Sequence, residues 1–154
     1  MKNKGVEIFI PIELERERSE KSDFALFNIE ILEYCFFQMK GLSINNCSFD
    51  GKESVVGVET QLTRGRVNDH PTQSRLYLFT DFDSLIIAID PPVAALYRKE
   101  VGLKPKLEWE FYVIPSGELN CHHKMNHRIK SLQKIGYIEL QKYRIKEGWI
   151  KTWG

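Results

Sequence analysis

A continuous apolar run, Leu85-Ile-Ile-Ala-Ile89, constrains the fold of this chain more than any other feature. Every side chain of the run is apolar, so a strand formed by it must be covered on both faces, as a central strand of a sheet is. Asp90 and two prolines follow directly, a pattern typical of a helix cap and the first helical turn. We therefore expect a central strand over residues 85–90 and then a short helix that ends near Val101.

The sequence before this run predicts strands and one large helix. Residues 6–15 alternate between apolar and polar side chains, which predicts a long N-terminal strand, and Pro11 favours an edge position for it. Apolar residues at spacings of three and four over residues 23–40 predict the main helix, which Gly41 ends. The other strands of this half are expected over residues 42–49 and 53–63, joined by a turn at Asp50-Gly51, and over residues 75–80 as the partner of 85–90.

The sequence after the run predicts a strand, a helix and a hairpin. Residues 107–114 alternate, with Leu107, Trp109, Phe111 and Val113 on one face. A helix is expected over residues 120–135 and a closing β-hairpin over 137–145 and 149–153. Together the elements predict one α+β domain over residues 1–154. It has a mostly antiparallel sheet with a long N-terminal strand, a main helix packed on the sheet, and a C-terminal helix plus β-hairpin.

Composition and cysteine use narrow the class of protein. Hydrophobic residues make up 42% of the chain and charged residues 28%, as in an ordinary folded domain. No apolar run reaches the roughly 20 residues that cross a bilayer, and no secretory signal is visible. Cys35, Cys47 and Cys121 are widely spaced and odd in number, which favours a reducing compartment over a disulfide framework.

Charge is distributed unevenly along the chain. The net charge is only +1, but residues 121–154 carry eight basic and two acidic side chains. A basic face of this kind binds phosphates, in RNA or in anionic lipid, or an acidic patch on a second copy of the chain. A polar loop, with Arg64, Arg66, Asp69 and His70, is a candidate contact loop. The candidate phosphate-binding residues are Lys124, Arg128, Lys130, Lys134, Lys142, Arg144, Lys146 and Lys151.

Catalytic and metal-binding patterns are weak. Asp50, Glu59 and Gln61 resemble the acid, acid-x-Lys arrangement that holds magnesium in restriction-type nucleases, but Gln61 stands where that pattern has lysine. His123 and His127 are four residues apart on the expected helix, but Lys124 replaces the glutamate that a zinc peptidase needs. We therefore expect no enzyme, no metal and no cofactor, and keep the magnesium-dependent nuclease as an alternative.

Three stretches resemble the globular part of a rhabdovirus-type matrix protein. They are VEIFIPIELERERSEKSDFALFNIEILEYC, KLEWEFYVIPSGEL and HRIKSLQKIGYIELQKYRIKEGWIKTW. A fourth stretch, RLYLFTDFDSLIIAIDPP, is similar to the central strands of the bornavirus matrix protein. The resemblance is one of pattern and covers most of the chain. The helix–glycine–hairpin ending also resembles a winged-helix module, which leaves a nucleic-acid-binding regulator as a further alternative.

The matrix resemblance implies a structural role without a catalytic site. A protein of this type associates with itself, condenses the viral ribonucleoprotein and links it to the inner face of an anionic membrane. The expected partners are therefore a second copy of the chain, the viral nucleocapsid or its RNA, and a membrane surface to which the protein binds peripherally. The expected location is the virion and the interior of the host cell.

Overall fold

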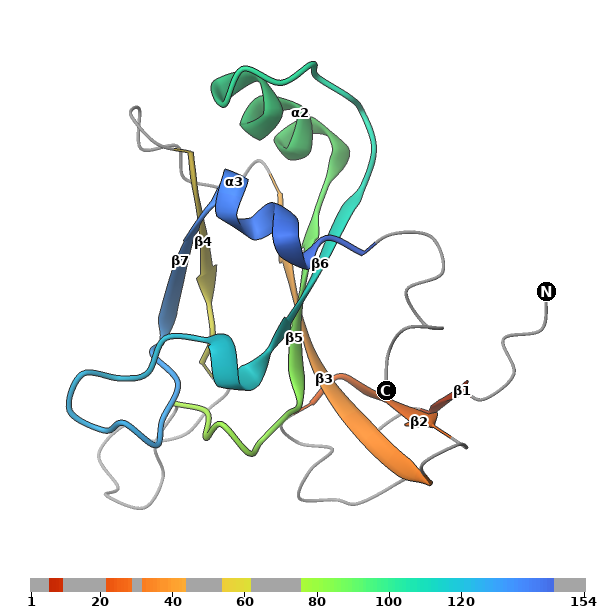
Figure 1. The fold of residues 1–154 in the computed structure, drawn as a ribbon, viewed down its shortest axis with the longest axis vertical. Helices are drawn as coiled ribbons and strands as arrows, with labels where there is room; N and C mark the ends of the chain where they lie inside the picture. Colours follow the sequence, from red (N-terminus) through yellow and green to blue (C-terminus); the bar gives the residue numbers. More distant parts are fainter. Residues whose placement is uncertain (1–5, 10–21, 29–31, 44–53, 62–75, 146–154) are drawn as a thin grey trace.

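The computed structural model describes residues 6–9, 22–28, 32–43, 54–61 and 76–145. They form a five-stranded sheet in the order β1-β2-β3-β5-β6 and a two-stranded sheet of β4 and β7 (Figure 1). Only the β3–β5 pair is parallel among the described strands, so the α+β class with a mostly antiparallel sheet is confirmed. The strands are β1 (Val6–Phe9), β2 (Phe24–Asn28), β3 (Glu33–Leu42), β4 (Val55–Glu59), β5 (Ser84–Ile89), β6 (Glu110–Pro115) and β7 (Leu132–Gly136).

The apolar run forms β5, and the central position predicted for it is confirmed. All six residues of β5 are buried, and β5 pairs with β3 on one side and with β6 on the other. The partner predicted for it, residues 75–80, is wrong. In that segment Leu76 and Leu78 make isolated bridges to Gln61 and Arg128, and a turn follows them.

The helix predicted after Asp90 is confirmed as α2 (Pro91–Glu100), which lies at one end of the five-stranded sheet (Figure 1). The Asp90 carboxylate accepts a hydrogen bond from the Val93 backbone N–H at 3.2 Å, which satisfies a donor that the first turn leaves unpaired. Tyr97 on the inner face of α2 is fully buried and joins the main core. Gly102, with φ of 79°, lies just past the helix in the left-handed conformation that favours glycine.

The main helix predicted over residues 23–40 is wrong: this segment forms the antiparallel pair β2 and β3. Cross-strand aromatic contacts hold the pair together, because the Phe24 and Phe37 rings stack at 5.1 Å and the Phe27 and Tyr34 rings lie 4.7 Å apart. Parts of both strands are buried on both faces, so apolar residues appear without a period of two. Their three- and four-residue spacing therefore imitated a helix.

The expected C-terminal helix over residues 120–135 and the hairpin strand over residues 137–145 are also wrong. The chain is irregular up to residue 131 and then forms β7, which pairs with β4. The short helices α3 (Tyr137–Leu140) and η3 (Gln141–Tyr143) follow. The buried side chain of Gln133 fixes β7 against the preceding segment. Its Oε1 accepts a hydrogen bond from the Asn120 N–H at 2.8 Å, and its Nε2 donates one to the Asn120 carbonyl at 2.9 Å.

Five expectations fall partly or wholly outside the described residues. β1 is an edge strand of the five, as predicted, but it is described only over Val6–Phe9, so a long N-terminal strand is not confirmed. The strand predicted over residues 53–63 corresponds to β4. The turn at Asp50-Gly51, most of the strand over 42–49 and the strand over 149–153 lie outside the described residues. Within the described part, no helix is long and apolar enough to span a bilayer.

The main core joins both sheets to α2. It contains Val56 and Val58 from β4, Leu85 and Ile87 from β5, and Tyr97 from α2. The short 3-10 helix η2 (Ser116–Glu118) follows β6, and α3 and η3 cross from the end of β7 back to β6 (Figure 1). This arrangement gives the molecule two distinct surfaces, one beside the β4–β7 pair and one at the α2 end of the sheet.

Candidate functional site

The basic residues predicted as one face do not share a helix, and they differ in what they contact. Arg144 lies 3.5 Å from the buried Glu110 carboxylate and 3.2 Å from Glu108. Arg128 donates from Nη1 to the Leu76 carbonyl at 2.8 Å. Lys142 lies 3.9 Å from Glu139. These three cations are therefore engaged within the fold, and Lys146 and Lys151 lie outside the described residues.

Lys124, Lys130 and Lys134 remain exposed, and none of them forms an ion pair with a carboxylate of the described residues. Lys134 lies on β7, opposite Gly57 of β4. Lys130 lies just before β7, where its carbonyl accepts a hydrogen bond from the Thr60 hydroxyl at 2.6 Å. The structure thus brings two of the predicted lysines to the β4–β7 pair.

A groove beside Lys134 is a concave site formed by described residues alone. It has a volume of about 540 Å³ and lies between the end of β3 and the β4–β7 pair. Leu42 and Val58 are almost completely buried beneath it, whereas Leu132 is 37% exposed. Sequence reasoning missed Lys40, because residues 23–40 were predicted as a helix. The lining residues are Lys40, Gly41, Leu42, Gly57, Val58, Glu59, Leu132 and Lys134.

The groove carries a net positive charge. Lys40 and Lys134 contribute two ammonium groups and Glu59 contributes one carboxylate. No ion pair within 4.0 Å joins Glu59 to either lysine, and neither lysine pairs with any other carboxylate of the described residues. An anion bound here would therefore interact with two cations that no described carboxylate neutralises. We call Lys40, Lys130 and Lys134 the groove-side lysines.

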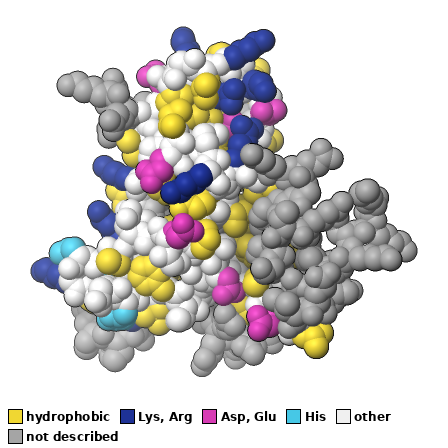
Figure 2. Space-filling view, viewed as in Figure 1, with side chains coloured by type: hydrophobic (Ala, Val, Ile, Leu, Met, Phe, Trp, Pro, Cys, Tyr) yellow, Lys and Arg dark blue, Asp and Glu magenta, His cyan; other side chains and the backbone are white. Residues whose placement is uncertain are grey.

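A second group of exposed lysines lies at the α2 end, and sequence reasoning missed it. Lys99 is in the last turn of α2, and Lys104 and Lys106 follow in the segment before β6. Trp109 and Phe111 stack with their ring centroids 6.0 Å apart, and their exposed fractions are 55% and 39%. Figure 2 shows basic side chains gathered at this end and others along the β4–β7 side. We call Lys99, Lys104 and Lys106 the α2-end lysines.

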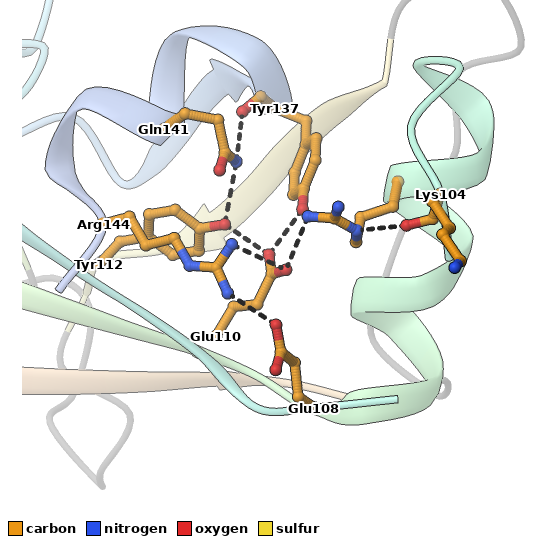
Figure 3. A network of polar contacts seen from close by, with 8 residues as sticks. Lys104, Glu108, Glu110, Tyr112, Tyr137, Gln141 and Arg144 are labelled. Atoms are coloured by element: carbon orange, nitrogen blue, oxygen red, sulfur yellow. Dashed lines mark hydrogen bonds and ion pairs between the residues drawn. The ribbon is translucent and has the colours of Figure 1, made fainter. Parts of the chain in front are cut away.

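Glu110 is the centre of a buried polar network (Figure 3). Its Oε1 accepts hydrogen bonds from the Tyr112 hydroxyl at 2.5 Å and the Tyr137 hydroxyl at 2.6 Å. Its Oε2 lies 3.5 Å from Arg144 and 3.9 Å from Arg98. Gln141 donates to the Tyr112 hydroxyl at 3.0 Å and extends the network to η3. Glu110 is 1% exposed. Its contacts connect β6 to α2 through Arg98 and to the C-terminal helices through Tyr137 and Arg144, so we call this network a structural tie.

The strand predicted over residues 107–114 is confirmed as β6 over Glu110–Pro115. Glu110, Tyr112 and Ile114 face the core, whereas Leu107, Trp109 and Phe111 are exposed. The inward side of β6 is therefore partly polar. Arg98 and Arg144 come from distant segments of the chain and compensate the charge of Glu110. This compensation allows β6 to bury a carboxylate on the face that points to the core.

Three buried tyrosines give the fold a predicted dependence on alkaline pH. Burial raises the pKa of Tyr77 to about 12, and burial together with the hydrogen bond to Glu110 raises the pKa of Tyr112 and of Tyr137. A raised pKa stabilises the fold fully below the unfolded value of about 10, and this contribution is lost as pH rises through the folded value. We expect tyrosinate absorbance at about pH 11 to be lower in the native than in the unfolded protein. Equal absorbance would contradict this assignment.

The nuclease and metal patterns are only partly described. Glu59 is exposed in the groove wall, Gln61 bridges Leu76, and Asp50 lies outside the described residues. His123 and His127 are in the irregular segment before β7 rather than on one face of a helix. Among the described residues, no group of three or more His, Cys, Asp and Glu side chains is arranged to hold a metal ion. The contact loop with Arg64, Arg66, Asp69 and His70 also lies outside them.

No protein-family model, curated protein or solved structure matches this chain. Function is therefore inferred from side-chain chemistry and geometry. The described features with binding chemistry are the groove with its lysines and the aromatic and basic surface at the α2 end.

Proposed function

We propose that this chain is a matrix-type viral assembly protein that associates with itself and links a ribonucleoprotein to an anionic membrane. The observation that carries the proposal is the presence of two groups of lysines, one at the groove and one at the α2 end. No lysine of either group pairs with a carboxylate of the described residues. Two such surfaces allow one molecule to hold two polyanions at once, as a linking protein must.

The α2-end surface suits RNA. Its lysines attract phosphates, and the stacked, exposed rings of Trp109 and Phe111 provide flat faces on which unpaired bases can stack. The groove side suits a membrane surface, because it combines lysines with aliphatic side chains. Leu32 and Tyr34 are exposed at the start of β3, and they provide apolar area for contact between copies of the chain.

The experiment is flotation of labelled single-stranded RNA with liposomes that contain phosphatidylserine. We expect RNA to float with the liposomes only when the protein is present, and to stay behind when salt screens the charges at about 1 M. Light scattering of the protein alone is expected to reveal oligomers. Binding to neither RNA nor liposomes, together with a strict monomer, would overturn the proposal. Magnesium-dependent shortening of the RNA would favour the nuclease instead.

Two triple variants separate the lysine groups. Replacing the α2-end lysines with glutamine is expected to abolish RNA flotation while liposome binding persists. Replacing the groove-side lysines is expected to abolish liposome binding while RNA binding persists. The control is Lys124→Gln with Lys142→Gln, which removes charge from neither group and is expected to leave flotation unchanged. Equal loss of both ligands in both triple variants would contradict the assignment of separate surfaces.

A further inference from the structure

We propose that the groove between β3 and the β4–β7 pair holds the phosphate of one anionic phospholipid. The phosphate lies between Lys40 and Lys134, and the apolar part of the lipid lies against the exposed side chain of Leu132 and the backbone of Gly41 and Gly57. This inference rests on the proposed function and deepens it, because it names the ligand and the side chains of the membrane-binding surface. The protein would then bind one lipid in a defined groove, in addition to its general electrostatic attraction to an anionic bilayer.

Charge complementarity is the first reason. Two ammonium groups and one carboxylate line the groove, and neither lysine forms an ion pair with a described carboxylate. A phosphodiester would offset the excess positive charge without displacing an existing partner. Lys130, just before β7, is exposed but does not line the groove, and its backbone carbonyl accepts a hydrogen bond from the Thr60 hydroxyl.

Shape and lining are the second reason. The volume of about 540 Å³ falls within the range typical of small-molecule sites. Gly41 and Gly57 lie in its walls and leave space there: a Cβ added at Gly41 would meet no atom within 4 Å, and one at Gly57 would meet only Leu132 Cδ1, at 3.9 Å. Backbone and aliphatic surface are thus accessible to a ligand beside the two ammonium groups.

The chemistry of the lining favours a lipid over a nucleotide. None of the eight lining residues is aromatic, so a base would find no ring on which to stack. Leu132, which is 37% exposed, offers apolar surface to the glycerol and the first acyl carbons of a phospholipid. The stacked and exposed pair Trp109 and Phe111 belongs to the α2-end surface instead.

The glycines provide a test that adds side-chain volume to the groove from two positions where a Cβ makes no close contact. Gly57→Ile places a β-branched side chain on a strand, where such residues are favoured, and the space at this position allows it. Gly41→Met fills the groove from the β3 side and serves as a second variant if the first fails to fold. The probes are soluble short-chain phosphatidylserine, the matching phosphatidylcholine, inorganic phosphate and a short single-stranded RNA. Binding is measured by titration calorimetry and by the shifts of the Gly41 and Gly57 amide signals.

In the wild-type protein, we expect short-chain phosphatidylserine to shift both glycine signals. In Gly57→Ile and Gly41→Met, we expect no measurable binding of this lipid, while the temperature of thermal unfolding stays near that of the wild type. Lys40→Gln and Lys134→Gln are each expected to weaken binding about fivefold. The matched control, Lys124→Gln, removes the same charge outside the groove and is expected to change binding less than about twofold. Weaker binding of phosphatidylcholine than of phosphatidylserine would support the two-lysine site.

Several outcomes would overturn the inference. They are undiminished lipid binding in Gly57→Ile or Gly41→Met, glycine shifts caused by RNA rather than lipid, and inorganic phosphate binding as tightly as the lipid. If intact phosphatidylserine vesicles still bind in those cases, only the groove is wrong and the linking function stands. If wild-type protein binds neither vesicles nor RNA, the proposed function fails with it.

Discussion

Replacing Glu110 with alanine is expected to lower the free energy of unfolding by about 3–5 kcal/mol, the usual loss when one partner is removed from a buried ion pair. The variant leaves Arg144 and Arg98 without their buried carboxylate and removes the acceptor of the Tyr112 and Tyr137 hydroxyls. Urea unfolding followed by circular dichroism measures the loss.

A conservative variant and a neighbouring residue separate charge from packing. Glu110→Gln keeps the shape and an acceptor oxygen for the tyrosines, so a large loss in this variant assigns the effect to the negative charge. Glu108 also pairs with Arg144, but half of its side chain is exposed to solvent. Glu108→Ala is therefore expected to cost less than about 1 kcal/mol. A loss below about 1 kcal/mol for Glu110→Ala would mean that the network is not a structural tie.

The segment from β5 to α2 was predictable because its signals are local. The apolar run specifies burial on both faces, and Asp90 with the two prolines that follow it specifies the start of a helix, all within neighbouring positions. The identity of the neighbours of β5 was not predictable. Its parallel partner β3 lies about 45 residues earlier, and no local pattern indicates that pairing.

The β2–β3 pair was mispredicted because burial on both faces removes the alternation that identifies a strand. The Phe24 and Phe37 rings stack as partners across the two strands, and a pattern read along one strand does not show this contact. Leu32, the residue before β3, has a φ of 55°. Neither glycine nor asparagine occupies this position, so the turn carries no sequence signal.

The candidate site was predicted in its chemistry and not in its geometry. The excess of lysine near the C-terminus pointed to Lys130 and Lys134, but their common surface with Lys40 depends on how β7 and β4 lie beside β3. Arg144 was counted as a free cation because its partners, Glu108 and Glu110, are more than 30 residues away in sequence. The α2-end lysines were missed because nearby acidic residues cancel them when charge is summed over long segments.

The salt dependence of RNA binding distinguishes two separate lysine surfaces from one continuous one. Each phosphate neutralised on a single strand changes the logarithm of affinity by about −0.7 per unit of log salt. Contact through the three α2-end lysines alone gives a slope of about −2, or a loss of about 20-fold between about 50 and 200 mM salt. RNA that also covers the three groove-side lysines gives a slope of about −4 and a loss of about 300-fold.

We expect the slope near −2, because the aromatic pair that would stack on bases lies only at the α2 end. Fluorescence anisotropy of a short labelled RNA, measured over a salt series, gives this slope. Replacing the three α2-end lysines with glutamine is then expected to bring the slope close to zero, whereas replacing the three groove-side lysines leaves it unchanged. A wild-type slope near −4 that falls to about −2 in both triple variants would mean that one RNA spans both surfaces. In that case the groove would be occupied by RNA in the assembled particle, and a membrane would need a different site on the molecule.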